Sequence, residues 1–199
     1  GYTLNQIAEA VEKSGNKKVS ISAKDFLSKV QDESFISKMV AKYPKLLSGL
    51  PTKDSGVKYR LEGYLFPATY NYTSDTTAET LIDQMLATMD SKLSTYYEVL
   101  ESKNLTVNDV LTLASLVEKE GSTDEVFNVY KNPGLMPGPV DSPSLSAIEA
   151  TVNPNKTDYL YFVANTETGT VYFATTYEEH AKNVEEHVNS KLTQSSSSN

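Results

Sequence analysis

The chain has 199 residues, of which 39% are hydrophobic and 22% are charged, and its formal net charge is −8. This length is sufficient for one sizeable core, or for a main domain with a small satellite. The acidic balance argues against nucleic acid as a partner, and the absence of cysteine excludes disulfides, thiolate metal sites and a cysteine nucleophile.

The first part of the chain is predicted to be helical. Apolar residues recur at helical spacing in "TLNQIAEAVEKSG", with Thr3 as the expected N-cap. After a short β-prone segment at 17–22, two further short helices are expected, over residues 23–31 and 33–43. Residues 44–75 are rich in turn formers and indicate either a boundary or a long functional loop.

Two longer helices are predicted next, over residues 76–104 and 105–121. Each opens with a capping-box pattern, Thr76-x-x-Glu79 and Thr106-x-x-Asp109 respectively. These helices make the middle of the chain the most strongly helical part of the sequence.

In the last third of the chain the spacing of apolar residues changes from a helical to a strand-like pattern. Residues 158–165 and 169–176 are β-branched and aromatic runs joined by "TETG", which predicts a β-hairpin. A last helix is expected over 177–192, and the Ser-rich tail at 193–199 is predicted to be disordered. The fold class is therefore α+β, mostly helical, with a late hairpin.

The helix at 105–121 ends with two acidic residues. The macrodipole favours cations in a last turn, yet Glu118 and Glu120 lie there. Glu118 continues the stripe of Ala114 and Ser115, whose small side chains leave room for a substrate. A carboxyl on that stripe is partly desolvated, which favours the protonated form that glycosidic-bond cleavage needs. A solvated helix end is the structural alternative, and periodicity does not choose between the two glutamates.

Three stretches carry a resemblance to a known family: "EGYLFPATY" at 62–70, "LASLVEKEG" at 113–121 and "GLMPGPVDSPSLSAIEATVNPNKTDYLYFVA" at 134–164. Together they resemble the MltG family, the YceG-like endolytic murein transglycosylases of bacteria. The resemblance implies a mostly helical, lysozyme-like catalytic domain over 57–192 with a C-terminal β-hairpin. The start of the chain resembles the back part of the family's LysM-like subdomain, so residues 1–56 are expected to hold that partial subdomain and a helical connector.

The resemblance also implies a reaction. In the family's V-E-K-E motif the first glutamate is catalytic, and here it is Glu118. It would protonate the oxygen between N-acetylmuramic acid and N-acetylglucosamine, and then accept the proton of the muramic C6 hydroxyl as that oxygen closes onto C1. The product has a 1,6-anhydromuramoyl end and no water is consumed. One group serves as acid and then base, so no second carboxylate is required.

Further residues are expected to bind substrate. The resemblance places the loop of Glu62, Tyr64 and Tyr70 beside the cleft, where Glu62 would contact sugar or influence Glu118 and the tyrosines would stack on sugar rings. An exposed loop carboxylate and aromatic core residues are the structural alternatives. Ser115 borders the acid on its helix, and Pro137 belongs to a stiff proline-rich segment that either lines the groove or is a rigid connector.

The sequence departs from the family pattern after Gly121. The family carries a few dozen residues there, and here "STDE" runs almost directly into "VFNVYKNPGL". Either this segment is deleted, or the numbering closes over it between Glu125 and Val126; we favour the second explanation. Asn128 and Tyr130 match a family element after the gap and are carried over as substrate contacts.

No cofactor and no metal are expected. His180 and His187 lie seven positions apart on one helix face, and two ligands without a third make a poor metal site.

Two functions from different classes fit the sequence. The first is an endolytic transglycosylase acting on peptidoglycan glycan strands. It would lie on the extracellular face of a bacterial membrane, anchored by an N-terminal transmembrane helix that precedes this sequence. Penicillin-binding proteins and other cell-wall synthesis or division proteins are the expected partners. The alternative is a non-catalytic peptidoglycan-binding or scaffolding module of the same machinery.

Overall fold

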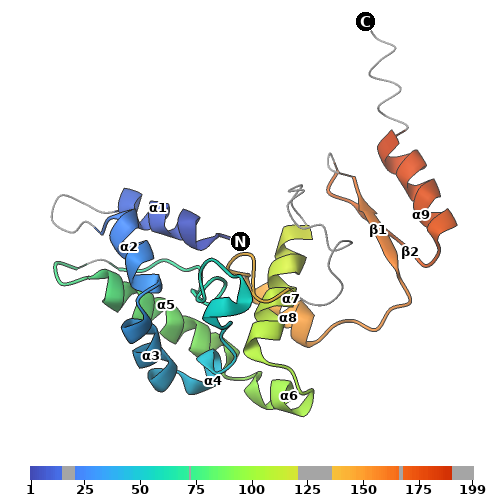
Figure 1. Cartoon of the computed structure of the whole chain (residues 1–199). Helices are drawn as coiled ribbons and strands as arrows, with labels where there is room; N and C mark the ends of the chain where they lie inside the picture. The colour runs from blue at the N-terminus through green and yellow to red at the C-terminus, as the bar shows by residue number, and fades with distance from the viewer. Residues whose placement is uncertain (15–20, 72, 121–135, 166–167, 190–199) are drawn as a thin grey trace, which may run out of the picture. The chain divides into compact units, whose positions relative to one another are not determined.

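The computed structural model describes residues 1–14, 21–71, 73–120, 136–165 and 168–189 (Figure 1). Its elements are α1 Leu4–Ser14, α2 Ala23–Val30, α3 Glu33–Lys42, α4 Pro44–Leu47, a 3₁₀ turn Lys53–Ser55, α5 Ala78–Leu93, α6 Tyr97–Ser102, α7 Val107–Glu120, α8 Leu145–Val152, β1 Tyr161–Ala164, β2 Val171–Ala174, α9 Tyr177–Val184 and a π-helical turn Glu185–Asn189. The chain divides into two compact units, Gly1–Pro154 and Asn155–Asn199. The predicted α+β class is confirmed, since the described residues form helices and one two-stranded sheet.

The core of the first unit is made by the apolar faces of its helices. In α1 the buried residues recur at helical spacing, at Leu4, Ile7, Ala8 and Val11, so one face of the helix packs against α2. Helices α2 and α4 pack against α5, and α7 lies along α8 (Figure 1). Within the described ranges, no helix is both long and apolar enough to cross a lipid bilayer.

The starts of α1 and α7 follow the predicted capping. In α1 the Gln6 amide donates to Thr3 Oγ1 at 3.3 Å, and the Thr3 amide donates to Gln6 Oε1 at 2.9 Å. In α7 the Asp109 amide donates to Thr106 Oγ1 at 3.1 Å, and the Thr106 amide donates to Asp109 Oδ2 at 2.9 Å. These reciprocal bonds satisfy amides that have no partner inside the helix.

The start of α5 lies one residue later than predicted. Thr77, rather than Thr76, takes the extended conformation of an N-cap, with φ −112° and ψ 167°, and it forms the capping box with Thr80. Glu79 therefore takes no part in the capping box, and its carboxylate forms an ion pair with the Lys29 ammonium on α2 at 2.8 Å.

The prediction of one helix over 76–104 is wrong, because the segment forms α5 and α6 with a turn between them. The Tyr96 amide donates to the Leu93 carbonyl at 2.8 Å, a contact three residues back that ends α5. The Tyr97 hydroxyl then donates to Asp90 Oδ1 at 2.6 Å, which fixes the start of α6 against the end of α5.

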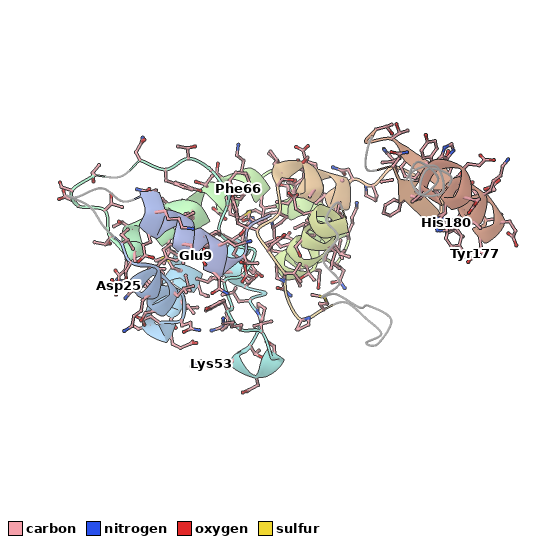
Figure 2. The ribbon with its side chains drawn as sticks, turned by 90° about the horizontal axis from the view of Figure 1, so that it is seen from above. Glu9, Asp25, Lys53, Phe66, Tyr177 and His180 are labelled. Carbon is pink, nitrogen blue, oxygen red and sulfur yellow. The ribbon has the colours of Figure 1, made fainter. Side chains whose placement is uncertain are left out.

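The second unit is an antiparallel hairpin covered by α9. The register pairs Phe162 with Phe173, and α9 packs on both strands. His180 stacks on Tyr161 at 5.4 Å between ring centroids, and Figure 2 shows its side chain on α9 with that of Tyr177. The predicted disordered tail lies outside the described residues.

The expected domain boundary near residue 56 lies inside the first compact unit, and the assignment of the two domains stays a prediction. Helices α2 and α4, from the first expected domain, pack against α5. The Leu4 amide also donates to Glu62 Oε1 at 2.8 Å. The division falls instead after Pro154, where the chain leaves α8 for the hairpin.

Candidate active site

Glu118, near the C-terminal end of α7, is held by groups from two distant parts of the chain. Its Oε2 accepts hydrogen bonds from the Ser144 hydroxyl at 2.6 Å and from the Ser144 amide at 3.2 Å. Its Oε1 accepts from the amino group of Gly1 at 3.0 Å. The Glu118 side chain is 23% exposed, so the carboxyl is partly buried and still accessible to solvent.

The two faces of α7 explain this partial burial. Val110, Leu111 and Ala114 are fully buried, whereas Val117 is 50% exposed on the opposite side. Glu118 lies on the inward stripe, one turn beyond Ala114, and the helix ends shortly after it. The carboxyl therefore sits at the rim of the core, as the sequence pattern predicts.

Two opposing effects set the pKa of Glu118. Burial raises its pKa, because a desolvated carboxylate is disfavoured. The hydroxyl and amide of Ser144 act in the opposite direction, because hydrogen bonds to the carboxylate favour the ionised form. Whether the carboxyl is protonated therefore depends on the balance between its burial and its Ser144 partners, and the expected protonated form stays a prediction.

Ser115 joins α7 to the proline-rich loop. Its side chain is fully buried; the hydroxyl donates to the Thr112 carbonyl at 2.8 Å and accepts from the Val140 amide at 3.1 Å. The loop is also held by Asn108, whose Nδ2 donates to the Pro137 carbonyl at 3.1 Å. Ser115 thus supports the loop that carries Ser144 to Glu118.

We expect Ser115→Ala to lower the free energy of unfolding by about 1–2 kcal/mol, because the Val140 amide loses its acceptor in a partly buried place. Urea denaturation measures the change. Ser102→Ala is the matched control, since Ser102 also donates to a carbonyl three residues back but is exposed on α6. Equal effects of the two substitutions would contradict the supporting role of Ser115.

Glu62 is partly buried and ties the start of α1 to the loop at 62–70. Its Oε1 accepts from the Leu4 amide at 2.8 Å. Burial raises its pKa to about 7; the Asp141 carboxylate acts in the same direction, while the Leu4 amide and Lys58 oppose them. This carboxyl therefore titrates within the neutral pH range.

Gly63 allows the loop at 62–70 to approach the proline-rich loop closely. Its φ is +82°, in the left-handed region. A Cβ at this position would lie 2.3 Å from the Pro139 Cβ and 2.9 Å from the Asp141 carbonyl oxygen. Only glycine fits both the backbone conformation and the space.

A groove of about 610 Å³ runs beside the loop at 62–70, between α1 and α5. Its walls include the aromatic rings of Tyr2, Phe66 and Tyr70, and Figure 2 shows Phe66 near α1, where Glu9 is labelled. The Tyr70 hydroxyl donates to the Phe66 carbonyl at 2.7 Å, which fixes the curve of the loop. Tyr2 lines this groove, and the residue before it, Gly1, binds Glu118 through its main-chain nitrogen. One end of the groove therefore lies one residue from a partner of Glu118.

The predicted site residues divide into three sets. Glu118, Glu62, Tyr70 and Pro137 are at least partly accessible. Tyr64 and Ser115 are fully buried, and the Tyr64 hydroxyl donates to Asn108 Oδ1 at 3.2 Å. These two side chains support the loops and offer no surface to a ligand in this structure. Asn128 and Tyr130 lie outside the described residues.

The sequence reasoning did not identify Ser144 or the first residues of the chain as parts of the site. Ser144 does have a local signal, because serine before a helix is a preferred N-cap, and its Oγ accepts from the Ala147 amide. Nothing local indicates that the same hydroxyl reaches Glu118. No group of three or more metal-ligating side chains is found in the described part of the chain.

The fold and the site define a helix-rich protein in which a glutamate at a helix end meets a proline-rich loop. The model of the YceG-like family matches residues 1–126 and 122–186. The chain belongs to the YceG-like family, and the resemblance seen in the sequence is confirmed.

The chain is similar to curated proteins from three bacterial strains, each named endolytic murein transglycosylase. The proteins of Streptococcus pneumoniae serotype 2 (strain D39 / NCTC 7466) and of strain ATCC BAA-255 / R6 are both 51% identical to it, over 96% of this chain and 44% of their own length. The protein of Bacillus subtilis (strain 168) is 31% identical, over 96% of this chain and 64% of its own length. The chain thus spans about half the length of these relatives.

A solved structure has the same fold. The crystal structure of a putative YceG-like protein from Listeria monocytogenes superposes with a TM-score of 0.75 and is 32% identical, covering 91% of this chain and 73% of that one. The correspondence with the pneumococcal relative extends over 243 positions, although the chain has 199 residues. The relative therefore has residues with no counterpart here, and the two family matches meet at 122–126, where the sequence departs from the family pattern.

Proposed function

We propose that this chain is part of an endolytic murein transglycosylase that cleaves peptidoglycan glycan strands between N-acetylmuramic acid and N-acetylglucosamine. The observation that carries the proposal is the partly buried, accessible carboxyl of Glu118, which Ser144 holds at the end of α7. Relatives up to 51% identical are named endolytic murein transglycosylases, which supports the same activity.

The proposed reaction uses one carboxyl twice. Protonated Glu118 donates its proton to the bridging oxygen, and the bond between that oxygen and C1 of the muramic residue breaks. The muramic C6 oxygen then bonds to C1, and its proton passes to the Glu118 carboxylate. The products are a free hydroxyl on one strand and a 1,6-anhydromuramoyl end on the other, and the glutamic acid is restored.

The hydrogen bonds of Glu118 place a condition on this reaction. In the first step the carboxyl must be protonated, although its bonds from Ser144 favour the ionised form. A bound glycan that covers the remaining exposed part of the side chain raises the pKa of Glu118 by desolvation. Substrate binding therefore prepares the acid, and the Ser144 bonds then hold the carboxylate in place for the second step.

Substrate is proposed to lie along accessible parts of the site. Glu62, Tyr70 and Pro137 are the described candidates for contacts with sugar, and the aromatic walls of the groove suit the apolar faces of sugar rings. Tyr64 and Ser115 act by support, and Asn128 and Tyr130 remain proposed contacts. We also propose a lysozyme-like cleft over 57–192 and a partial LysM-like subdomain within 1–56.

The cellular setting is part of the proposal. An enzyme that acts on glycan strands works on the extracellular face of the membrane, where an N-terminal transmembrane helix preceding this sequence would anchor it. Penicillin-binding proteins and other cell-wall proteins are the proposed partners. A binding or scaffolding module without cleavage is the alternative.

The product ends test this function. Uncrosslinked glycan strands are incubated with the protein, and the ends are identified by mass spectrometry. We expect internal cuts with 1,6-anhydromuramoyl ends, and no increase in reducing ends. Reducing ends would indicate a hydrolase, which adds water. Binding without any product between about pH 4 and 8, the range in which carboxyls like these titrate, would support the scaffolding module.

A further inference from the structure

We propose that Ser144 is a positioning residue for Glu118, and that its hydroxyl and amide hold the carboxylate in the orientation and ionised form needed to take the proton from the C6 hydroxyl. This inference rests on the proposed function for its catalytic meaning, whereas the contact itself is a property of the structure.

Both donors of Ser144 converge on one carboxylate oxygen. The hydroxyl donates to Glu118 Oε2 at 2.6 Å, and the amide donates to the same oxygen at 3.2 Å. The hydroxyl also accepts from the Ala147 amide at 3.3 Å. A serine hydroxyl has one proton and two lone pairs, so donation to Glu118 and acceptance from Ala147 are compatible. The Ser146 hydroxyl lies 3.0 Å from Ser144 Oγ and can donate to its second lone pair. With both lone pairs occupied in this way, the proton of Ser144 is the one that reaches Glu118.

The position of Ser144 at the first turn of α8 strengthens this contact. Ser144 is the N-cap, with φ −70° and ψ 161°, and α8 continues for eight residues. The N-terminal end of a helix carries partial positive charge and stabilises a nearby anion. The first turn of α8 contains no acidic residue; the acidic residue of this helix, Glu149, follows in the second turn and accepts a hydrogen bond from the Tyr96 hydroxyl at 3.2 Å.

The other oxygen of Glu118 faces the first residue of the sequence. The main-chain nitrogen of Gly1 lies 3.0 Å from Oε1, and the Asp141 carboxylate lies close to Gly1. Ser144 binds Oε2 independently of this contact.

This arrangement has opposite effects on the two proposed steps. Stabilising the carboxylate makes Glu118 a stronger acid, which holds its first proton less well at neutral pH, and a weaker base toward the C6 hydroxyl, so the second step depends on the orientation that Ser144 gives the carboxylate. Removing the hydroxyl should therefore shift the pH range of activity upward and reduce the maximal rate. A residue that only caps α8 would change neither the titration of Glu118 nor the position of the pH profile.

The experiment is a titration of Glu118 in the whole chain by NMR, with ¹³C-labelled glutamate carboxyls and Glu118→Gln to assign the signal. We expect Ser144→Ala to raise the pKa of Glu118 by about one pH unit. The alkaline limb of the pH–rate profile on glycan strands should move by the same amount. Ser144→Thr keeps the hydroxyl and should restore both wild-type values.

Ser22→Ala is the matched control, because Ser22 is likewise a serine N-cap and has no contact with Glu118. It should change the stability of the chain as a lost cap does, and leave the titration of Glu118 unchanged. A titration curve of Ser144→Ala that superposes on wild type would overturn the inference. If wild type makes no anhydro product, the proposed function fails, but the titration still decides the role of Ser144.

Discussion

Glu118→Gln is expected to reduce the rate of glycan cleavage at least 100-fold, since positioned general acid–base groups contribute about 10²–10⁴ to enzymatic rates. A glutamine has the same shape as the glutamate, and its side-chain oxygen can still accept from the Ser144 hydroxyl. The substitution removes only the proton that passes to the bridging oxygen and the base that later receives it. The rate is measured as the appearance of anhydromuramoyl ends on uncrosslinked strands.

Two controls separate chemistry from folding. Glu101→Gln changes an exposed glutamate of α6 in the same way and should cleave at the wild-type rate. The urea midpoint of Glu118→Gln should lie close to wild type, because the glutamine oxygen can keep both hydrogen bonds from Ser144. If the Gln variant cleaves as fast as the wild type, Glu118 is not the acid and the proposed reaction is wrong.

Glu62→Gln is expected to remove a large pH dependence from the stability of the fold. The pKa of Glu62 is raised from 4.5 to about 7, so between these values the folded chain binds more protons than the unfolded chain. The free energy of unfolding therefore falls as pH rises through this window, by about 3 kcal/mol for this group. Glutamine keeps an acceptor for the Leu4 amide and carries no charge.

The test compares urea unfolding of both proteins between about pH 4 and pH 8, a window that brackets the two pKa values. The variant should be about as stable as wild type at the acid end and more stable at the alkaline end. Glu12→Gln, on the exposed side of α1, should leave the difference between the two pH values unchanged. Parallel curves for wild type and Glu62→Gln would mean that Glu62 ionises normally in the folded chain.

Glu62 and Glu118 are two partly buried glutamates with different surroundings. Burial raises the pKa of each, and Glu62 lies deeper than Glu118. Glu118 accepts two hydrogen bonds from Ser144, whereas Glu62 faces the Asp141 carboxylate and accepts one amide, that of Leu4. Depth and hydrogen-bond partners therefore act in the same sense, and both favour the protonated form more strongly at Glu62.

Much of the fold could be predicted from local patterns. The 3.6-residue spacing of apolar side chains identified α1, α2, α3 and α7, and the alternating aromatic runs identified the hairpin. Capping at Thr3, Thr106 and Thr176 is also local, since the bonding atoms are three residues apart. The turn between α5 and α6 was missed because apolar residues keep their helical spacing across it, and spacing does not report a single i→i−3 contact.

The sequence by itself determined the helices, the hairpin, the family and Glu118 as the candidate acid, because these depend on neighbouring residues or on short motifs. Only the tertiary structure decided which groups hold Glu118 and oppose the effect of burial on its pKa. Its partners Ser144 and Gly1 are 26 and 117 positions away in the sequence. Hydrogen bonds over such separations depend on the path of the whole chain, and no local pattern contains that path.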